Sequence, residues 1–144
     1  MTEADRPDSA EVDLDGMCAF LGRKDIDFAV LFGSHARGVA EDSSDVDIAL
    51  KFHDDIDERE CFRRRNRIDA EVQAYADGFV DVSDIETLPT HVARAALREG
   101  IPLVGEKSVI DAYRARTEAE YDARSGERKN EREQFIERLA RGDV

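Results

Sequence analysis

Two aspartates separated by one residue, Asp45 and Asp47, are the residues of this chain best suited to chemistry. They open a run of apolar residues typical of a strand, and side chains two positions apart on a strand point to the same face. Carboxylates held that close raise the cost of ionising each other unless a cation lies between them. Magnesium prefers oxygen ligands and completes its shell with substrate phosphates. The pair therefore predicts a magnesium site that acts on a phosphate-bearing substrate.

A small-residue turn, Gly33-Ser34, precedes these acids and lies just before a short helix expected at residues 36–40. The start of a helix offers unpaired N–H groups and the positive end of its dipole, which together favour an anion. Gly and Ser are also common in ordinary turns, so this pair alone is weak evidence. In combination with the aspartate pair, it predicts phosphoryl or nucleotidyl transfer.

This constellation resembles the signature of the polymerase-beta-type nucleotidyltransferase superfamily, in its small minimal nucleotidyltransferase (MNT) branch. Three stretches carry the resemblance: Gly33-Ser34, Ala36-Arg37-Gly38 and Ser44-Asp45-Val46-Asp47-Ile48-Ala49-Leu50. The resemblance is close over residues 28–52, and the order of elements agrees more loosely through about residue 105.

The resemblance implies a third carboxylate on a later strand. Asp81 lies inside a run rich in strand-forming residues and is the expected group, while Asp84, at the expected end of that strand, is the alternative. On this interpretation Asp45, Asp47 and Asp81 are catalytic residues and hold two magnesium ions. Asp81 either completes the metal site or acts as the base on the attacking hydroxyl.

The resemblance also assigns the nucleotide-binding residues, which are Gly33, Ser34 and Arg37. Ser34 is expected to donate its hydroxyl and N–H to the β- and γ-phosphates of ATP. Arg37 either contacts those phosphates or supports the site through a nearby acid.

The implied activity is transfer of AMP from ATP to a hydroxyl, with release of pyrophosphate. MNT proteins commonly act as the antitoxin of a pair whose toxin is a helical HEPN-domain ribonuclease, and the acceptor is then a tyrosine of that partner. Two alternatives stay open: a non-catalytic antitoxin that only binds and blocks the ribonuclease, and a small-molecule nucleotidyltransferase.

The charge balance limits the other partners. With 34 acidic and 21 basic residues, the chain has a net charge of −13, which argues against direct nucleic-acid binding. The acid-rich composition, with arginine far more frequent than lysine, favours a salt-loving cytoplasm. No apolar run approaches the roughly 20 residues that span a membrane, and the polar first residues do not resemble a secretory signal. We therefore expect a cytoplasmic protein. The arginine cluster at 63–67 is expected to be a solvated, acid-paired surface or, alternatively, a patch for an RNA, a nucleotide tail or an acidic partner.

The elements that position these residues suggest an α+β fold of the polymerase-beta type: a mixed, twisted sheet with flanking helices, mostly on one face. Strands are expected at 26–32, 45–52, 78–85 and 101–104, the last at a sheet edge because of Pro102. A first helix is expected up to about residue 23, with Asp8 as its cap, and a long second helix is expected at 57–76. Two further helices are expected to begin at Pro89 and at Ser108. We divide the chain into a disordered N-terminus (1–10), a nucleotidyltransferase domain (11–122) and a charged tail helix (123–144). The tail helix is expected to follow a solvated break at 122–133.

Overall fold

The computed structural model describes residues 12–33 and 46–142. The expected disordered N-terminus, the Asp8 cap and the short helix at 36–40 lie outside these residues, and so do Ser34, Arg37 and Asp45. Within the described part, α1 begins at Leu14, where Asp13 caps the helix by accepting a hydrogen bond of 3.0 Å from the N–H of Gly16.

A four-stranded mixed sheet forms the centre of the molecule, in the order β3-β2-β1-β4. Strand β1 is antiparallel to both β2 and β4, whereas β2 and β3 are parallel. The elements are α1 (Leu14–Gly22), β1 (Ile26–Phe32), β2 (Val46–Phe52), α3 (Glu58–Val72), η2 (Gln73–Tyr75), β3 (Val80–Asp84), η3 (Ile85–Thr87), α4 (Thr90–Glu99), β4 (Ile101–Gly105) and α5 (Lys107–Arg141). The mixed sheet and the edge position of β4 agree with the sequence-based expectation.

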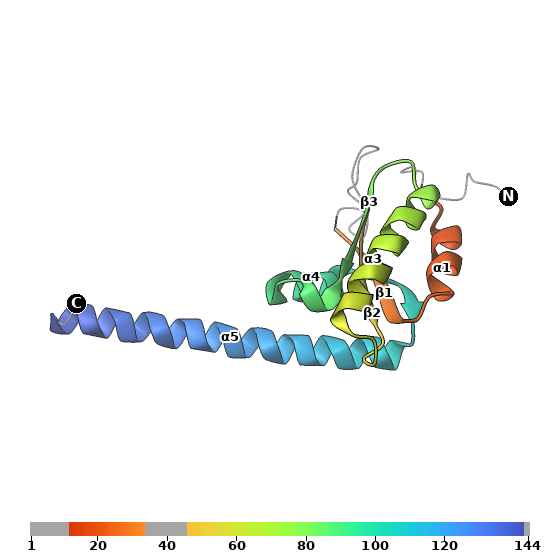
Figure 1. Ribbon diagram of the computed structural model, residues 1–144. Coiled ribbons are helices and arrows are strands. Elements are labelled where there is room, and N and C mark those ends of the chain that lie inside the picture. Colours follow the sequence, from red (N-terminus) through yellow and green to blue (C-terminus); the bar gives the residue numbers. More distant parts are fainter. Residues whose placement is uncertain (1–11, 34–45, 143–144) are drawn as a thin grey trace.

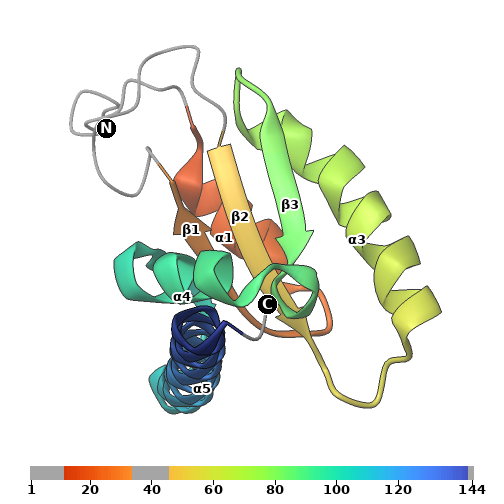
Figure 2. The same ribbon diagram turned by 90° about the vertical axis from the view of Figure 1, so that its left-hand side faces the viewer.

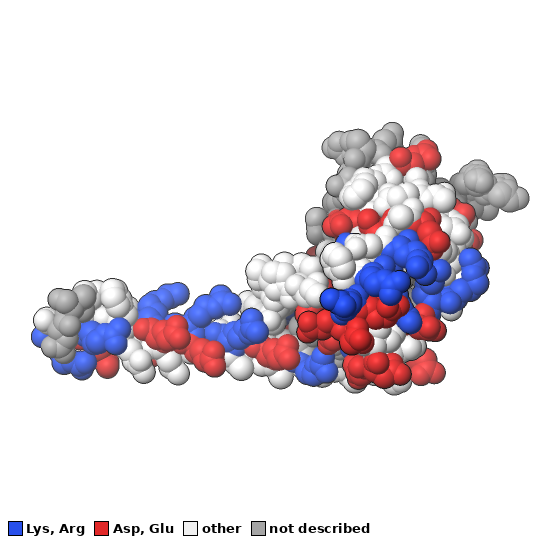
Figure 3. All heavy atoms as spheres, in the orientation of Figure 1, with Lys and Arg blue, Asp and Glu red and all other residues white. Residues whose placement is uncertain are grey.

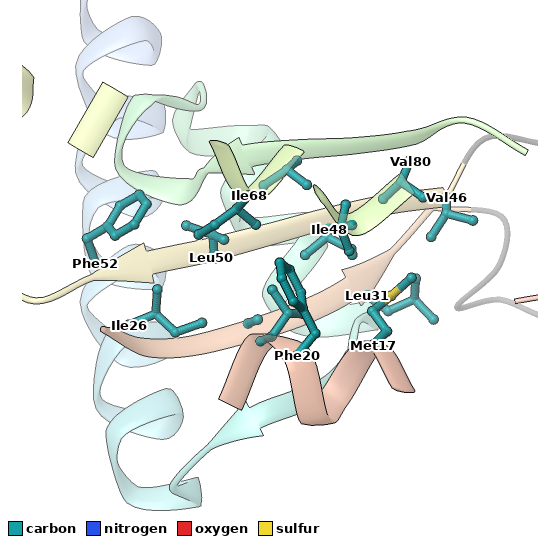
Figure 4. Packing of buried hydrophobic residues seen from close by; sticks show 14 residues of the cluster. Met17, Phe20, Ile26, Leu31, Val46, Ile48, Leu50, Phe52, Ile68 and Val80 are labelled. Carbon is teal, nitrogen blue, oxygen red and sulfur yellow. The ribbon is translucent and has the colours of Figure 1, made fainter. Parts of the chain in front are cut away.

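Helices cover both faces of the sheet, so the expectation of helices mostly on one face is wrong. One core packs α1 and α3 against alternate residues of β2, among them Ile48 and Leu50 (Figure 4). A second core packs α4 and the start of α5 against the other face, which contributes Phe28, Val30 and Ala49. Figure 2 shows α4 and α5 in front of the sheet, with α1 behind it. The buried run of β1, apolar on both faces, requires this two-sided cover.

Helix α5 is continuous from Lys107 to Arg141, so the expected break at 122–133 is wrong. Gly126 and Asn130 lie within it, but one such residue costs a helix only about 1 kcal/mol or less, and most of their neighbours are good helix formers. The helix ends at Gly142, which takes a left-handed conformation with φ of 77° and donates its N–H to carbonyls of the last turn. The separation of residues 123–144 as a distinct tail stays a prediction.

Candidate active site

The register of the parallel pair β2–β3 sets Asp47 directly beside Asp81. Val46 and Ile48 belong to the core under α1 and α3, so Asp47 points to the opposite face, and its register partner shares that face. Asp47 is half-buried and Asp81 is exposed. The amino-terminal halves of β2 and β3, which carry both acids, extend beyond α4 in Figure 2.

Gly33 brings the end of β1 into contact with Asp47. Phe32 is the antiparallel partner of Asp47, and Gly33 follows it with φ of +81°, a conformation that only glycine adopts readily. A Cβ atom at Gly33 would lie 2.5 Å from Oδ2 of Asp47, closer than real Cβ contacts. The structure therefore places Gly33, Asp47 and Asp81, from three neighbouring strand ends, together at one site.

Asp84 is used differently from Asp81. It lies three residues further along β3, so strand alternation directs it away from the face that Asp81 occupies. Its Oδ1 accepts a hydrogen bond of 3.0 Å from the N–H of Glu86 and so caps η3. Burial raises the pKa of Asp84, which makes its ionised form costly in the folded state. These observations favour Asp81 as the third carboxylate.

The donor chemistry of the described pair suits a hard cation. Asp47 and Asp81 offer carboxylate oxygens from adjacent strands on one sheet face, and such oxygens are the ligands that magnesium prefers. Within residues 12–33 and 46–142, no three His, Cys, Asp or Glu side chains gather as a metal-binding group. The third acid of the expected set, Asp45, lies outside the described residues.

The outer edge of β3 is held by side chains of α3 and by Gln73, the first residue of η2, an arrangement that sequence reasoning missed. Gln73 accepts a hydrogen bond of 2.9 Å from the N–H of Val80 and donates one of 2.6 Å to its carbonyl. The N–H of Val82 donates to Asp69 at 3.2 Å, and Arg65 donates to the Val82 carbonyl at 2.7 Å. Side chains spaced four residues apart on one helix face thus take the place of a neighbouring strand. They fix the strand that carries Asp81.

Replacing Gln73 with leucine is expected to lower the free energy of unfolding by about 2 kcal/mol, because both polar groups of Val80 lose their partner. Urea unfolding of the variant and the wild type measures this difference. Gln134→Leu, at an exposed position of α5, is the matched control and is expected to change stability little. Equal stability of the Gln73 variant and the wild type would show that water satisfies this edge instead.

The arginine cluster at 63–67 is largely engaged within the domain. Arg63 and Arg64 each bond to Glu60 at 2.9 Å, and Arg65 bonds to β3 as described above. Figure 3 shows this basic band beside a red, acidic region of the same surface. The arginine cluster is therefore chiefly an acid-paired surface, which confirms the first of the two expectations.

Lys51, buried on the sheet face that Asp47 shares, has its own partners. Its Nζ lies 2.7 Å from Oδ1 of Asp54 and 3.4 Å from Oδ2 of Asp27, and it donates to the Phe52 carbonyl at 2.8 Å. Burial works to lower the pKa of Lys51, but the bond to Asp54 and the surrounding carboxylates outweigh it and raise that pKa. Lys51 is thus a neutralised structural charge at the far end of β2 from the site.

Comparison with known proteins identifies both a family and a fold. The family model "Polymerase beta, Nucleotidyltransferase" matches residues 19–108, a span that holds Gly33, Asp47 and Asp81. No curated protein matches the chain closely enough in sequence to count as a relative.

Several solved structures share the architecture. One chain of a toxin–antitoxin structure with AMP-PNP has a TM-score of 0.67 at 20% identity, covering 85% of this chain and 96% of that one. One chain of the tri-AMPylated Shewanella oneidensis HEPN toxin in complex with its MNT antitoxin has a TM-score of 0.61 at 18% identity, with 85% and 98% covered. A chain of the MntA–HepT toxin–antitoxin gives 0.63 at 18% identity, with 86% and 97% covered. At these identities the likeness establishes a common fold.

Proposed function

We propose that this chain, because it belongs to the polymerase beta nucleotidyltransferase family, moves AMP from ATP to a hydroxyl of a HEPN-domain partner and is that partner's antitoxin. The observation that carries the proposal is the placement of Asp47 beside Asp81, with the Gly33 turn in contact. Two carboxylates next to a glycine turn, one half-buried and one exposed, suit the binding of a nucleoside triphosphate with its magnesium.

The reaction is a substitution at the α-phosphorus of ATP. The acceptor oxygen forms a bond to this phosphorus, the bond from the phosphorus to the oxygen bridging it to the β-phosphate breaks, and pyrophosphate leaves. The hydroxyl proton goes to a carboxylate, a role that the exposed Asp81 suits. Magnesium, held by Asp45, Asp47 and Asp81, would neutralise phosphate charge and lower the pKa of the hydroxyl. Gly33, Ser34 and Arg37 would orient the triphosphate, since positioning contributes much of the catalysis in phosphoryl transfer.

The choice of partner and nucleotide is supported by the solved structures of similar fold. They include a toxin–antitoxin with AMP-PNP and an AMPylated HEPN toxin bound to an MNT antitoxin. We infer that a tyrosine of the HEPN partner is the acceptor, because its hydroxyl can attack the α-phosphorus and its modification would block a neighbouring ribonuclease site.

Incubation of the chain with ATP, magnesium and a HEPN partner, followed by intact-mass spectrometry, tests the proposal. The partner is expected to gain the mass of one or more adenylyl groups while pyrophosphate accumulates. Inhibition of the partner without any mass gain would favour the alternative of an antitoxin that acts by binding alone. Modification of a small molecule and not of the partner would favour the second alternative.

The choice between Asp81 and Asp84 is testable by a matched pair of variants. Asp81→Asn is expected to slow AMP transfer by about 10²-fold or more, the usual loss when a general base is removed. Asp84→Asn is expected to retain transfer, because an asparagine oxygen can still cap η3. Initial rates of partner modification measure both effects, and the reverse ranking would assign the role to Asp84.

The Asp84→Asn variant is also expected to change how stability depends on pH. Folding raises the pKa of the Asp84 carboxyl. Such a group destabilises the folded protein as pH rises from the pKa of the unfolded state, near 3.9, through the pKa of the folded state. Urea unfolding should therefore show Asp84→Asn gaining stability relative to the wild type as pH increases above about 4. A difference that is independent of pH would contradict the raised pKa.

We also infer adaptation to a salt-rich cytoplasm. No helix in the described residues has the length and apolar character needed to cross a membrane. The net charge of −13 creates self-repulsion that dissolved salt screens. The urea midpoint of unfolding is expected to rise between dilute buffer and molar potassium chloride, and equal midpoints would contradict the inference.

A further inference from the structure

The second half of α5, residues 122–141, extends away from the domain (Figure 1). We call it the distal segment. Every residue in it is exposed, including the large apolar side chains of Phe135, Ile136 and Leu139, which are 46%, 55% and 50% exposed. A helix of this length that buries nothing is marginal in water, because most helical stability in proteins comes from packing an apolar face.

The charges of the distal segment do not favour an isolated helix. Residues four apart are neighbours on a helix surface, and like charges at that spacing destabilise it. Four such pairs are of like charge: Arg124–Arg128, Arg128–Arg132, Glu127–Glu131 and Glu133–Glu137. Two are of opposite charge: Lys129–Glu133 and Glu137–Arg141. At a spacing of three the signs balance, with two like pairs (Lys129–Arg132, Arg138–Arg141) and two opposite pairs (Arg124–Glu127, Arg128–Glu131). The sequence therefore suits a helix that is stabilised by contacts with another element.

The face of the distal segment that needs this contact is defined by the first half of α5. Eighteen residues are five full turns, so Phe135 lies on the same helix face as Thr117, and Leu139 lies on the same face as Tyr121. Thr117 is buried, and the ring of Tyr121 lies 4.2 Å from the guanidinium of Arg94 on α4. Beyond the domain, this face continues along the distal segment, where another helix could take the place of α4.

A second copy of this chain is the occupant that the charges favour. The distal segment has five acidic and six basic residues, so it is nearly neutral in a chain of net charge −13. Figure 3 shows the two signs alternating along it. Two copies therefore repel one another through their domains but not through this segment. An antiparallel arrangement also keeps the two domains at opposite ends.

We propose that the distal segments of two copies pair as antiparallel helices, making the chain a dimer. In the register that we propose, Arg132 of each copy faces Glu131 of the other at the two-fold axis. Arg128 then lies opposite Phe135, over whose ring its guanidinium can stack. Arg124 covers Leu139 with its aliphatic stem. In a parallel pair, Arg124, Arg128 and Arg132 of one copy would instead face the same arginines of the other copy, and these like charges would repel.

Light scattering coupled to size-exclusion chromatography of the full chain tests whether the distal segments form a dimer. The wild type is expected to have about twice the 16.2 kDa mass of one chain at high micromolar concentration. The double variant Phe135→Ser/Leu139→Ser is expected to be monomeric, whereas Gln134→Ser, off this face of the same helix, stays dimeric. A monomeric wild type, including one that associates only with a HEPN partner, would overturn the proposal. A dimer that survives the double serine variant would overturn it as well.

Charge reversal tests the register independently of any loss of apolar surface. Glu131→Arg and Arg132→Glu each bring like charges together at the axis, so each is expected to weaken dimerisation at least tenfold. The combined variant Glu131→Arg/Arg132→Glu restores opposite charges and is expected to regain the wild-type dimer. Single variants that dimerise as tightly as the wild type, or a double variant without rescue, would refute this pairing.

Discussion

Asp47→Asn is expected to reduce AMP transfer by about 10²–10³-fold, the loss typical of removing one preorganised electrostatic group. Asp47 is the described acid that contacts both other parts of the site, Gly33 and the strand of Asp81. Its amide replacement keeps the shape but removes the charge that a cation and a triphosphate need. Initial rates of partner modification at saturating ATP measure this loss.

The stability of the same variant separates a functional charge from a structural one. Removing Asp47 relieves its like-charge repulsion with Asp81 on the adjacent strand, so the free energy of unfolding without metal is expected to stay equal or to rise slightly. Asp55→Asn is the matched control, because Asp55 lies in an exposed turn after the carboxyl-terminal end of β2, whereas Asp47 lies near its start. This variant should keep both activity and stability. Near-normal turnover in the Asp47 variant would refute its place in the site.

Gly33→Ala is expected to reduce both stability and transfer. The left-handed backbone at φ of +81° costs an L-residue about 1–2 kcal/mol, and the new Cβ would meet Oδ2 of Asp47. Either the end of β1 or the carboxylate must move, and a displacement of about 1 Å can cost a catalytic site 10²-fold. Urea unfolding and initial rates on the same samples give the two effects.

Gly22→Ala supplies the control for this substitution. Gly22 closes α1, and a Cβ there would have nothing within 4 Å. The alanine is expected to be neutral or slightly stabilising, because it reduces the freedom of the unfolded chain. If Gly33→Ala changed stability and AMP transfer as little as Gly22→Ala, the close approach of Gly33 to Asp47 would not be needed for either.

The strand alternation of β2 was predictable from the sequence alone. Val46, Ile48 and Leu50 pack in the core beneath α1 and α3, while Asp47 points to the other face, as their spacing of two requires. The pairing of Asp47 with Asp81 was not predictable in the same way. It depends on the parallel register of strands far apart in the sequence, which local patterns do not specify.

Two features of the fold escaped sequence reasoning for separate physical reasons. The spacing of Arg65, Asp69 and Gln73 places them on one face of α3 and of the η2 turn that continues it, but nothing local indicates that this face meets the edge of β3. In α5, the almost wholly polar run at 122–133, which contains the poor helix formers Gly126 and Asn130, indicates a break that the structure does not have. Their individual costs are small, and the residues around them favour the helix.

The fate of each phosphorus of ATP tests the central claim most directly. ATP labelled at either the α- or the γ-phosphorus is incubated with magnesium, this chain and a HEPN partner, and the protein-bound label is measured. The account predicts that the partner retains the α-label, while the γ-label leaves in pyrophosphate. Retention of the γ-label, or of neither label by a partner that this chain nevertheless inhibits, would contradict it.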